Sequence, residues 1–487
     1  MNNKQPASIA FLIFTSIIVS FVTFFCCLSK QGYELLFLFP ATFAATIVLF
    51  KPFLTLVKKY TGFKILFAIY CLKYLVLPFS ISFSDINKGI GIDPTPSNIR
   101  IATLILLMEL FVVVAVLSLA GKKFLLAKKR TELFKKGEKY NGSNIGYILV
   151  IALAIVLLIL HPDLINNFSF INYNSSSKTI SYFLGLDIRI VQLSFSLIFI
   201  VSTSICAYRY SITRSGFYYY FSLFIGLLTM VVIKGDNRAS FLVSILSTLI
   251  TMIVAFPSNK KKTFISIIIV GGLALVSLSI YRQVTVTDWR PQGGQLSFTF
   301  DSISGTLQTY LSGPRLVAQG LGAIQHQSIS FSTIFSDIFI WSGYIGNILS
   351  DRFGLVLSGT SYAFNAYLYG ESLSGVGDQI VPLSVQSIWY FGFFGALVLP
   401  VLISLLLVYF ESKFCSSKTY GQLFINAMMV IIFGLFPGYN ISILFLYYFD
   451  RYLISYLIIL VIDEIKKRTS KRSLNKNENI ICHSRTH

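Results

Sequence analysis

Long apolar segments recur along most of the chain and constrain its fold more than any other feature. A helix needs about 20 consecutive apolar residues to cross the hydrocarbon core of a bilayer. We identify twelve such segments, with approximate limits at residues 8–28, 32–50, 63–83, 99–120, 145–161, 185–207, 217–233, 239–256, 263–281, 384–409, 420–437 and 440–462. Only 12% of the 487 residues are charged, about half of the share that a soluble domain carries. The sequence therefore predicts an all-α polytopic membrane protein with about 12 transmembrane helices.

The positive charges predict on which side of the membrane each loop lies. The chain has 40 Lys and Arg against 20 Asp and Glu. If the amino terminus is cytoplasmic and the loops alternate, 26 of these 40 cations fall on the cytoplasmic side, and eleven are spread over the longer outside loops. We therefore expect both termini in the cytoplasm, with a retained first helix rather than a signal peptide. The net charge of +20 is then explained by topology and by contact with anionic membrane lipid, and no nucleic acid partner is expected.

Four segments follow from this topology. Residues 1–281 contain transmembrane helices 1–9, residues 282–383 form a large extracytoplasmic loop between spans 9 and 10, residues 384–463 contain helices 10–12, and residues 464–487 form a basic cytoplasmic tail. Residues 331–349 are also apolar, but a crossing there would place the basic tail outside. We therefore expect a re-entrant or interfacial helix within the large loop.

Several classes of cytoplasmic chemistry are excluded by the motifs that the sequence lacks. It has no glycine-rich loop ending in Lys-Ser or Lys-Thr and no Asp-x-Asp pair, so neither ATP-driven transport nor a metal-bound nucleotide sugar is expected. The six cysteines lie within spans, at the inner surface or in the tail, and their spacing predicts neither a disulfide framework nor a metal site. Chemistry is therefore expected on the outer face, without a cofactor or a metal.

Cations are the main candidate binding residues outside the membrane. The large loop contains four arginines and many Tyr and Trp residues. Guanidinium groups bind phosphates, and aromatic faces stack on sugar rings. The turn between spans 7 and 8 adds two cations beside the start of a helix. The candidate ligands of a diphosphate are Lys234, Arg238, Arg282, Arg290, Arg315 and Arg352.

Each of these two features has an alternative interpretation. The large loop can be a lid that packs on the helices. The turn at Lys234 and Arg238 can be an ordinary capped turn whose cations reach lipid phosphates.

Four side chains of the loop are candidate proton acceptors, and the sequence does not rank them: His326, Asp351, Glu371 and Asp378. His326 is the only histidine of the loop, and histidine accepts protons near neutral pH. A lone loop histidine is nevertheless more often a bystander.

Few charged residues lie within the predicted spans. Lys73 and Glu109 occur at similar depth on consecutive antiparallel helices, which favours a structural ion pair over a role in substrate binding. Asp450 and Arg451 are neighbours in the sequence and point about 100° apart on a helix, so they are expected to have different partners.

The combination of these features resembles the O-antigen and capsular polysaccharide repeat-unit polymerases, the Wzy-type family. The features are the twelve predicted spans, a Gly-x-x-Arg turn at Gly235 and Arg238, the large late loop, and the following helix that opens with the sequence SIWYFGFFG at Ser387. Arg282 and Gly293 are separated by ten residues, a spacing found in outside loops of some members.

The resemblance implies a glycosyltransferase on the outer face of the bacterial cytoplasmic (inner) membrane. Such enzymes join undecaprenyl-pyrophosphate-linked oligosaccharides, as the growing chain leaves its lipid carrier for a sugar hydroxyl of a new repeat unit. A chain-length regulator protein and a flippase are the partners that the resemblance implies. Arginines that stabilise the departing diphosphate would make this chemistry independent of metal and ATP.

Three alternatives remain at the level of the sequence. A flippase or transporter of lipid-linked oligosaccharide would be expected to show internal repeats and broken helices, and we find no two similar halves. An O-antigen ligase uses the same donor on the same face of the membrane, so the sequence separates it poorly from a polymerase. A scaffold protein would not need the arginines and aromatic residues of the large loop.

Overall fold

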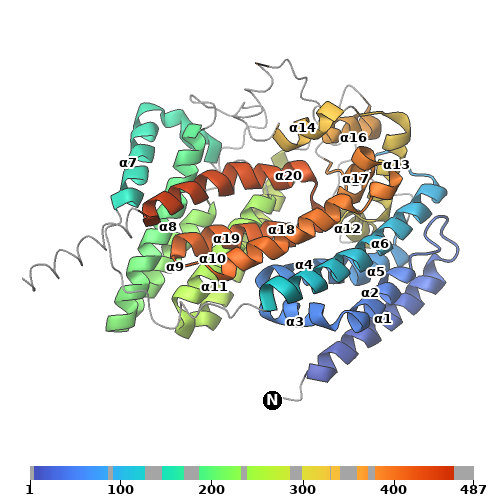
Figure 1. The fold of residues 1–487 in the computed structure, drawn as a ribbon, viewed down its shortest axis with the longest axis horizontal. Helices are drawn as coiled ribbons and strands as arrows, with labels where there is room; N and C mark the ends of the chain where they lie inside the picture. Colours follow the sequence, from blue (N-terminus) through green and yellow to red (C-terminus); the bar gives the residue numbers. More distant parts are fainter. Residues whose placement is uncertain are drawn as a thin grey trace, which may run out of the picture. The chain divides into compact units, whose positions relative to one another are not determined.

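The fold is known from a computed structural model (Figure 1). It describes residues 5–85, 91–126, 145–168, 186–231, 238–285, 299–329, 331–339, 352, 359–370 and 379–464. Within these ranges every regular element is a helix and no strand occurs, which confirms the predicted all-α class.

The number of helices long enough to cross a membrane is lower than predicted. Six described helices are long and apolar enough to cross a membrane: Ile9–Cys27, Thr61–Ser82, Pro96–Leu126, Asp187–Thr213, Phe393–Cys415 and Ile441–Glu464. Two further pairs of consecutive helices are long and apolar enough only if each pair is counted as one span. The pairs are bent by 86° at residue 50 and by 118° at residue 256. The described part of the chain therefore has up to eight candidate spans.

Helix length and bending explain the difference from twelve. The predicted spans 239–256 and 263–281 form the second bent pair, which counts as one span at most. Three predicted spans are the apolar helices Gly146–Leu160, Gly216–Met230 and Tyr420–Gly434. Each has a length of about 22 Å, whereas the hydrocarbon core is about 30 Å thick. The described residues therefore establish six to eight candidate membrane spans and do not confirm twelve.

The region predicted as a large loop contains several helices. The described parts of residues 282–383 form α12 (Phe300–Tyr310), α13 (Pro314–His326), α14 (Phe331–Phe339) and α16 (Thr360–Tyr369). The helix expected at residues 331–349 is therefore present over its first part, and residues 340–349 lie outside the described residues.

The chain forms two compact units, each assembled from separate stretches of sequence. Unit 1 comprises Met1–Lys129, Gly294–Ser412 and Val430–Tyr447, and unit 2 comprises Arg130–Gly293, Lys413–Met429 and Tyr448–His487. The other α-helices described in unit 1 are α1 (Gln5–Cys27), α2 (Leu38–Leu49), α3 (Lys51–Lys59), α4 (Thr61–Cys71), α5 (Leu77–Ser82), α6 (Pro96–Gly121), α17 (Leu383–Phe391) and α20 (Ile441–Leu446). Those of unit 2 are α7 (Ile145–Leu160), α8 (Leu186–Thr213), α9 (Gly216–Val231), α10 (Arg238–Ala255) and α11 (Lys260–Thr285). Residues of α18 (Val398–Cys415) and α19 (Tyr420–Gly434) belong to both units.

An ion pair lies within the helices of unit 1. A π-helical segment, Leu72–Val76, joins α4 to α5 and carries Lys73. The Lys73 ammonium lies 3.5 Å from a carboxylate oxygen of Glu109 on α6, and the two side chains are 1% and 5% exposed. The predicted ion pair is therefore confirmed, and it connects two apolar helices.

Hydrogen bonds in unit 1 join segments that the sequence assigns to the same side of the membrane. On the predicted inner side, the Glu411 carboxylate accepts hydrogen bonds from the backbone N–H groups of Thr61 (3.0 Å) and Gly62 (2.8 Å) at the start of α4. On the predicted outer side, Lys30 donates to three carbonyl oxygens at the end of α5, those of Ile81, Ser82 and Ser84. Each cluster caps a helix end, where backbone groups otherwise lack partners.

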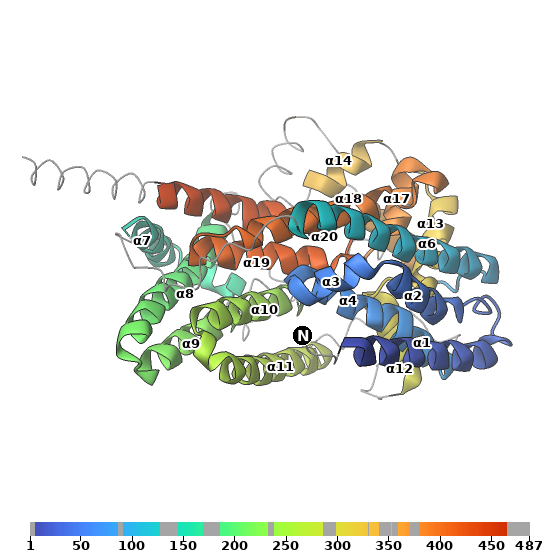
Figure 2. The same cartoon turned by 60° about the horizontal axis from the view of Figure 1, so that its bottom comes forward.

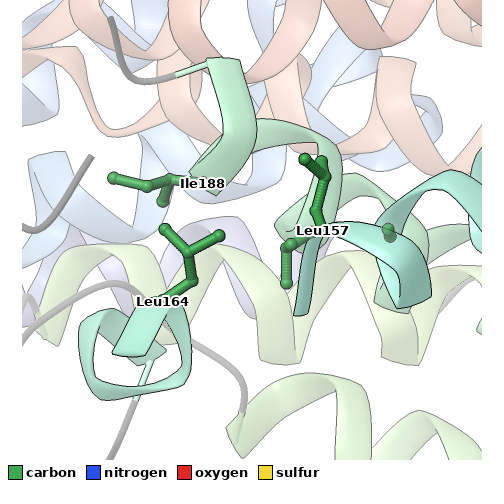
Figure 3. Packing of buried hydrophobic residues seen from close by; sticks show 5 residues of the cluster. Leu157, Leu164 and Ile188 are labelled. Atoms are coloured by element: carbon green, nitrogen blue, oxygen red, sulfur yellow. The ribbon is translucent and has the colours of Figure 1, made fainter. Parts of the chain in front are cut away.

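Unit 2 is held by apolar packing between neighbouring helices. Leu157 of α7, Leu164 of the following 3-10 turn and Ile188 of α8 belong to one buried cluster (Figure 3). α10 and α11 lie side by side (Figures 1 and 2). A Cβ atom at Gly271 of α11 would lie only 2.9 Å from the Ile245 side chain of α10, so glycine allows this close approach.

Candidate functional site

A small pocket in unit 1, lined by polar and apolar side chains, is the candidate functional site. Its volume is about 60 Å³, and helices α12, α13 and α16 contribute to its wall. That volume holds about four water-sized molecules, or one group of the size of a phosphate. The polar side chains that line it are Gln308, Thr309, Arg315, Gln319 and Gln379.

The start of α13 positions Arg315 in this pocket. Pro314 occupies the first turn of the helix after Gly313, where its fixed φ favours helix initiation and its missing N–H group has no cost. The Arg315 backbone N–H donates to Gln308 Oε1 of α12 at 2.9 Å, so the glutamine acts as a cap. The Arg315 side chain is only 8% exposed.

Close packing holds α13 in place. A Cβ atom at Gly320 would lie 2.5 Å from Val385 of α17, so only glycine permits this approach. On another face α13 packs beside α6 (Figure 1). The part of the pocket wall that α13 forms is therefore closely packed against α6 and α17.

Arg315 forms an ion pair with a residue far away in the sequence. Its Nη2 donates to Oδ1 of Asp93, which lies just before α6 and is 69% exposed. The backbone of this segment is also bound, because Gln319 Nε2 donates to the Ile92 carbonyl oxygen at 2.9 Å. The described lining of the pocket thus combines one cation, three amides and one hydroxyl with apolar side chains, and the Asp93 carboxylate pairs with the cation.

Two residues outside the lining hold the pocket glutamines. Tyr33 accepts a hydrogen bond from Gln308 Nε2 at 3.4 Å. Burial raises the pKa of Tyr33, so its hydroxyl stays neutral. Asn365 of α16 accepts from the Gln379 backbone N–H at 3.2 Å, which fixes the start of the segment leading to α17.

A second polar cluster surrounds Asp337 of α14, which is 1% exposed. Its carboxylate accepts from the backbone N–H and the hydroxyl of Thr360 at the start of α16, the latter at 2.6 Å. Gln386 of α17 donates at 3.1 Å, Ser442 of α20 donates at 2.9 Å, and the Tyr390 hydroxyl donates through a short contact. The carboxylate thus joins four helices, and it caps the helix that carries part of the pocket wall.

Among the predicted diphosphate ligands whose side chains the structure describes, Arg315 lines the pocket. Arg352 is exposed. Arg238 is the first residue of α10 and Arg282 lies in α11, but their side chains are not among those described. Lys234 and Arg290 lie outside the described residues. Residues 234, 238, 282 and 290 belong to unit 2, whereas Arg315 and Arg352 belong to unit 1.

The predicted proton acceptors are only partly described. His326 is exposed at the last position of α13 and stacks on Tyr367, with ring centroids 5.5 Å apart. Arg315 and His326 lie at opposite ends of this helix, about 16 Å apart along its axis. Asp351, Glu371 and Asp378 lie outside the described residues.

No group of three or more His, Cys, Asp or Glu residues that could hold a metal ion occurs in the described ranges. The polar lining of the pocket consists instead of amides, a hydroxyl and a guanidinium. These groups bind anions and sugar hydroxyls through hydrogen bonds.

The sequence interpretation missed most of the pocket. Gln308, Gln319 and Gln379 are neutral, and Asp93 lies in a short segment that has no motif. A signal that could have drawn attention to them is the occurrence of uncharged amides near Arg315 in a region expected outside the membrane.

Comparison of the chain with protein-family models, with curated proteins and with solved structures finds no match. The resemblance to the repeat-unit polymerases and the activity that it implies therefore stay predictions.

Proposed function

We propose that this protein is a membrane glycosyltransferase that polymerises undecaprenyl-pyrophosphate-linked oligosaccharide repeat units. The product is an O-antigen or capsular polysaccharide, and the reaction takes place on the outer face of the bacterial cytoplasmic membrane. The observation that carries the proposal is the buried Arg315 in a pocket whose other polar lining consists of amides and a hydroxyl. Such a pocket suits a ligand that contains both phosphate and sugar hydroxyls.

In the proposed reaction, Arg315 binds the diphosphate that links the growing saccharide to its lipid. A hydroxyl oxygen of the incoming repeat unit attacks the anomeric carbon of that saccharide and forms the new glycosidic bond. The bond from the anomeric carbon to the phosphate oxygen breaks, and the diphosphate leaves with the electron pair. Arg315 stabilises the negative charge that develops on this leaving group, and the energy comes from the broken linkage.

The proton of the attacking hydroxyl has to pass to a base within about 3 Å. His326 is about 16 Å from Arg315 along α13, so it is badly placed to serve an anomeric carbon held at Arg315. The base is then expected among Asp351, Glu371 and Asp378, all predicted on the same side of the membrane.

The proposal includes a topology of about twelve spans with both termini in the cytoplasm. The contacts of unit 1 support it, because Asp93 and Arg315 come from two segments that the charge pattern assigns to the outside. Glu411 and Thr61 come from segments assigned to the inside. In unit 2, Asp463 accepts a hydrogen bond from Tyr147, and both residues lie at ends of predicted spans that face the inside.

The experiment compares polysaccharide from cells that lack the gene and carry either the wild-type chain or Arg315→Ala. We expect a ladder of chain lengths from the wild type and single repeat units from Arg315→Ala, at equal protein level in the membrane. Arg100→Ala is the matched control, because Arg100 is half exposed and paired with Glu34 outside the pocket. A normal ladder in Arg315→Ala would remove this residue from the site.

The deletion strain separates the alternative functions. Loss of a polymerase leaves single repeat units attached to the cell surface, whereas loss of a flippase abolishes that product as well. Loss of a ligase leaves polymer on the lipid carrier and none on lipid A core sugar. The sequence also predicts single repeat units for Arg238→Ala and Arg282→Ala.

A further inference from the structure

A short segment before α6 lies against the pocket. Gly91 has a φ of +76°, and a Cβ atom there would lie 2.9 Å from Leu368 of the pocket wall. The next residue, Ile92, accepts the hydrogen bond from Gln319, and Asp93 pairs with Arg315. Three consecutive residues therefore contact three different residues that line the pocket.

The two partners of the ion pair at the pocket differ strongly in their exposure to solvent. The Arg315 side chain is 8% exposed, whereas the Asp93 side chain is 69% exposed. A largely buried guanidinium without an anion is costly, because it loses the solvation by water without compensation. Asp93 supplies this anion, while its own side chain stays accessible to solvent.

We infer that Asp93 is an internal substitute for the ligand, and that a phosphate group of the ligand displaces it from Arg315. A phosphate ester or diphosphate carries more negative charge than a carboxylate and has more acceptor oxygens for a guanidinium. It can therefore replace Asp93 at the same donor. The identity of the ligand as a lipid-linked diphosphate rests on the proposed function, but the exchange of anions does not.

The exchange needs little rearrangement. The Asp93 side chain can rotate into solvent because most of its surface is already exposed. The backbone on either side is held independently, by the bond from Gln319 to Ile92 and by Thr95, which caps α6 by accepting from the Asn98 N–H at 3.2 Å. Displacement of Asp93 therefore leaves the pocket wall in place.

The inference has a consequence for affinity. In the wild type, an incoming phosphate competes with a carboxylate that is tethered beside Arg315. Asp93→Asn removes the competing charge and keeps the size of the side chain. The variant is therefore expected to bind phosphate compounds more tightly than the wild type, which is the opposite of the effect of losing a residue that helps to bind the ligand.

The test measures binding of inorganic pyrophosphate to the purified full-length chain in detergent by titration calorimetry. We expect about tenfold tighter binding by Asp93→Asn than by the wild type, and loss of binding in the double variant Asp93→Asn, Arg315→Ala. Glu34→Gln is the matched control, since it removes a carboxylate from another arginine in unit 1, and its affinity should equal that of the wild type. Equal or weaker binding by Asp93→Asn would overturn the inference.

A second probe separates the source of the phosphate. Farnesyl diphosphate should gain from Asp93→Asn by the same factor as pyrophosphate if the pocket binds the diphosphate group. If Asp93→Asn increased the affinity for pyrophosphate but not for farnesyl diphosphate, the assignment of this pocket to a lipid-linked ligand would be wrong. The proposed exchange of anions at Arg315 would still hold.

Failure of this inference and failure of the proposed function give different results. If Asp93→Asn does not tighten binding but cells still require Arg315 for the polysaccharide ladder, the exchange is wrong and the function stands. If Asp93→Asn tightens binding but the deletion strain keeps its ladder, the exchange stands and the polymerase function is wrong.

Discussion

Two buried cations of unit 1 are paired with carboxylates in contrasting surroundings. Lys73 and Glu109 are both almost fully buried between apolar helices, with exposures of 1% and 5%. Arg315 is buried at the wall of a pocket, but its partner Asp93 is 69% exposed. Both partners of the first pair are closed to solvent, whereas the carboxylate of the second pair is open to it, and this difference is the basis of the proposed exchange of anions. A buried cation paired with a buried carboxylate therefore indicates a structural role. A buried cation paired with an exposed carboxylate indicates a role in binding, because the carboxylate can move away into solvent.

The largest expected effect comes from breaking the closed pair. Glu109→Gln leaves the Lys73 ammonium buried without its counter-charge, and loss of one partner of a buried pair costs about 3–5 kcal/mol. Denaturant unfolding in detergent measures this loss. The double variant Lys73→Met, Glu109→Leu should recover most of it, since an apolar pair needs no desolvation of charge. A loss below about 1 kcal/mol in Glu109→Gln would show that the pair is not closed to water.

A smaller loss is expected at the Asp337 cluster. Asp337→Ala removes the acceptor for Thr360, Gln386, Tyr390 and Ser442, and buried donors without acceptors cost about 1–3 kcal/mol each. Part of this cost is relieved by water that enters the space, so we expect a net loss of about 2–4 kcal/mol. The same unfolding measurement tests it, and Asp337→Asn should lose less because one carbonyl acceptor remains. An unchanged stability in Asp337→Ala would mean that the cluster does not hold α14, α16, α17 and α20 together.

The open pair should contribute less to stability than the closed pair. Asp93→Asn is expected to lose about 1–2 kcal/mol, more than an exposed pair because the Arg315 guanidinium is largely buried, and less than Glu109→Gln because the Asp93 side chain is mostly in contact with solvent. Pyrophosphate should raise the melting temperature of this variant more than that of the wild type, since a ligand that binds the folded state stabilises it. Differential scanning fluorimetry with and without pyrophosphate measures both effects. A loss as large as that of Glu109→Gln would contradict the contrast between the pairs.

The smallest effect is expected at Glu34 and Arg100, where solvent reaches both partners, whose side chains are 28% and 50% exposed. The hydrogen bond from Arg100 lowers the pKa of Glu34 from 4.5 to about 2. Because the folded-state pKa is depressed, the pair stabilises the protein above the unfolded-state pKa, and this contribution is lost as the pH falls from about 4.5 towards 2. The melting temperatures of wild type and Glu34→Gln should therefore differ slightly at neutral pH and converge on acidification. A difference that does not change with pH would exclude this cause.

The sequence was sufficient for features that depend on local periodicity or on depth in the membrane. Runs of apolar residues located the helices, and the matched depth of Lys73 and Glu109 predicted their ion pair. The sequence also indicates Arg315 as a candidate diphosphate ligand, because it is an arginine in a region predicted outside the membrane. The predictions of the helices and of the ion pair are confirmed because each depends on a repeat of the helix or on the cost of charge in lipid, whereas the role of Arg315 stays a prediction.

The pocket itself could not be predicted in this way. Asp93 and Arg315 are 222 positions apart, and their contact depends on how α6 and α13 pack. Gln308, Gln319 and Gln379 give no charge signal, although their amides form much of the polar lining. Asp337 stands in an apolar segment, and its burial becomes understandable only when the donors from three other helices are known. Twelve spans were expected because hydropathy does not show where a helix ends early.

The most direct test uses the purified chain alone, reconstituted in liposomes with undecaprenyl-pyrophosphate-linked repeat units. The wild type should produce a ladder of saccharide lengths and release undecaprenyl diphosphate without added metal or ATP, and Arg315→Ala should produce neither. Absence of any ladder from a folded wild-type chain, or an unchanged ladder from Arg315→Ala, would contradict the role of this arginine in polymerisation.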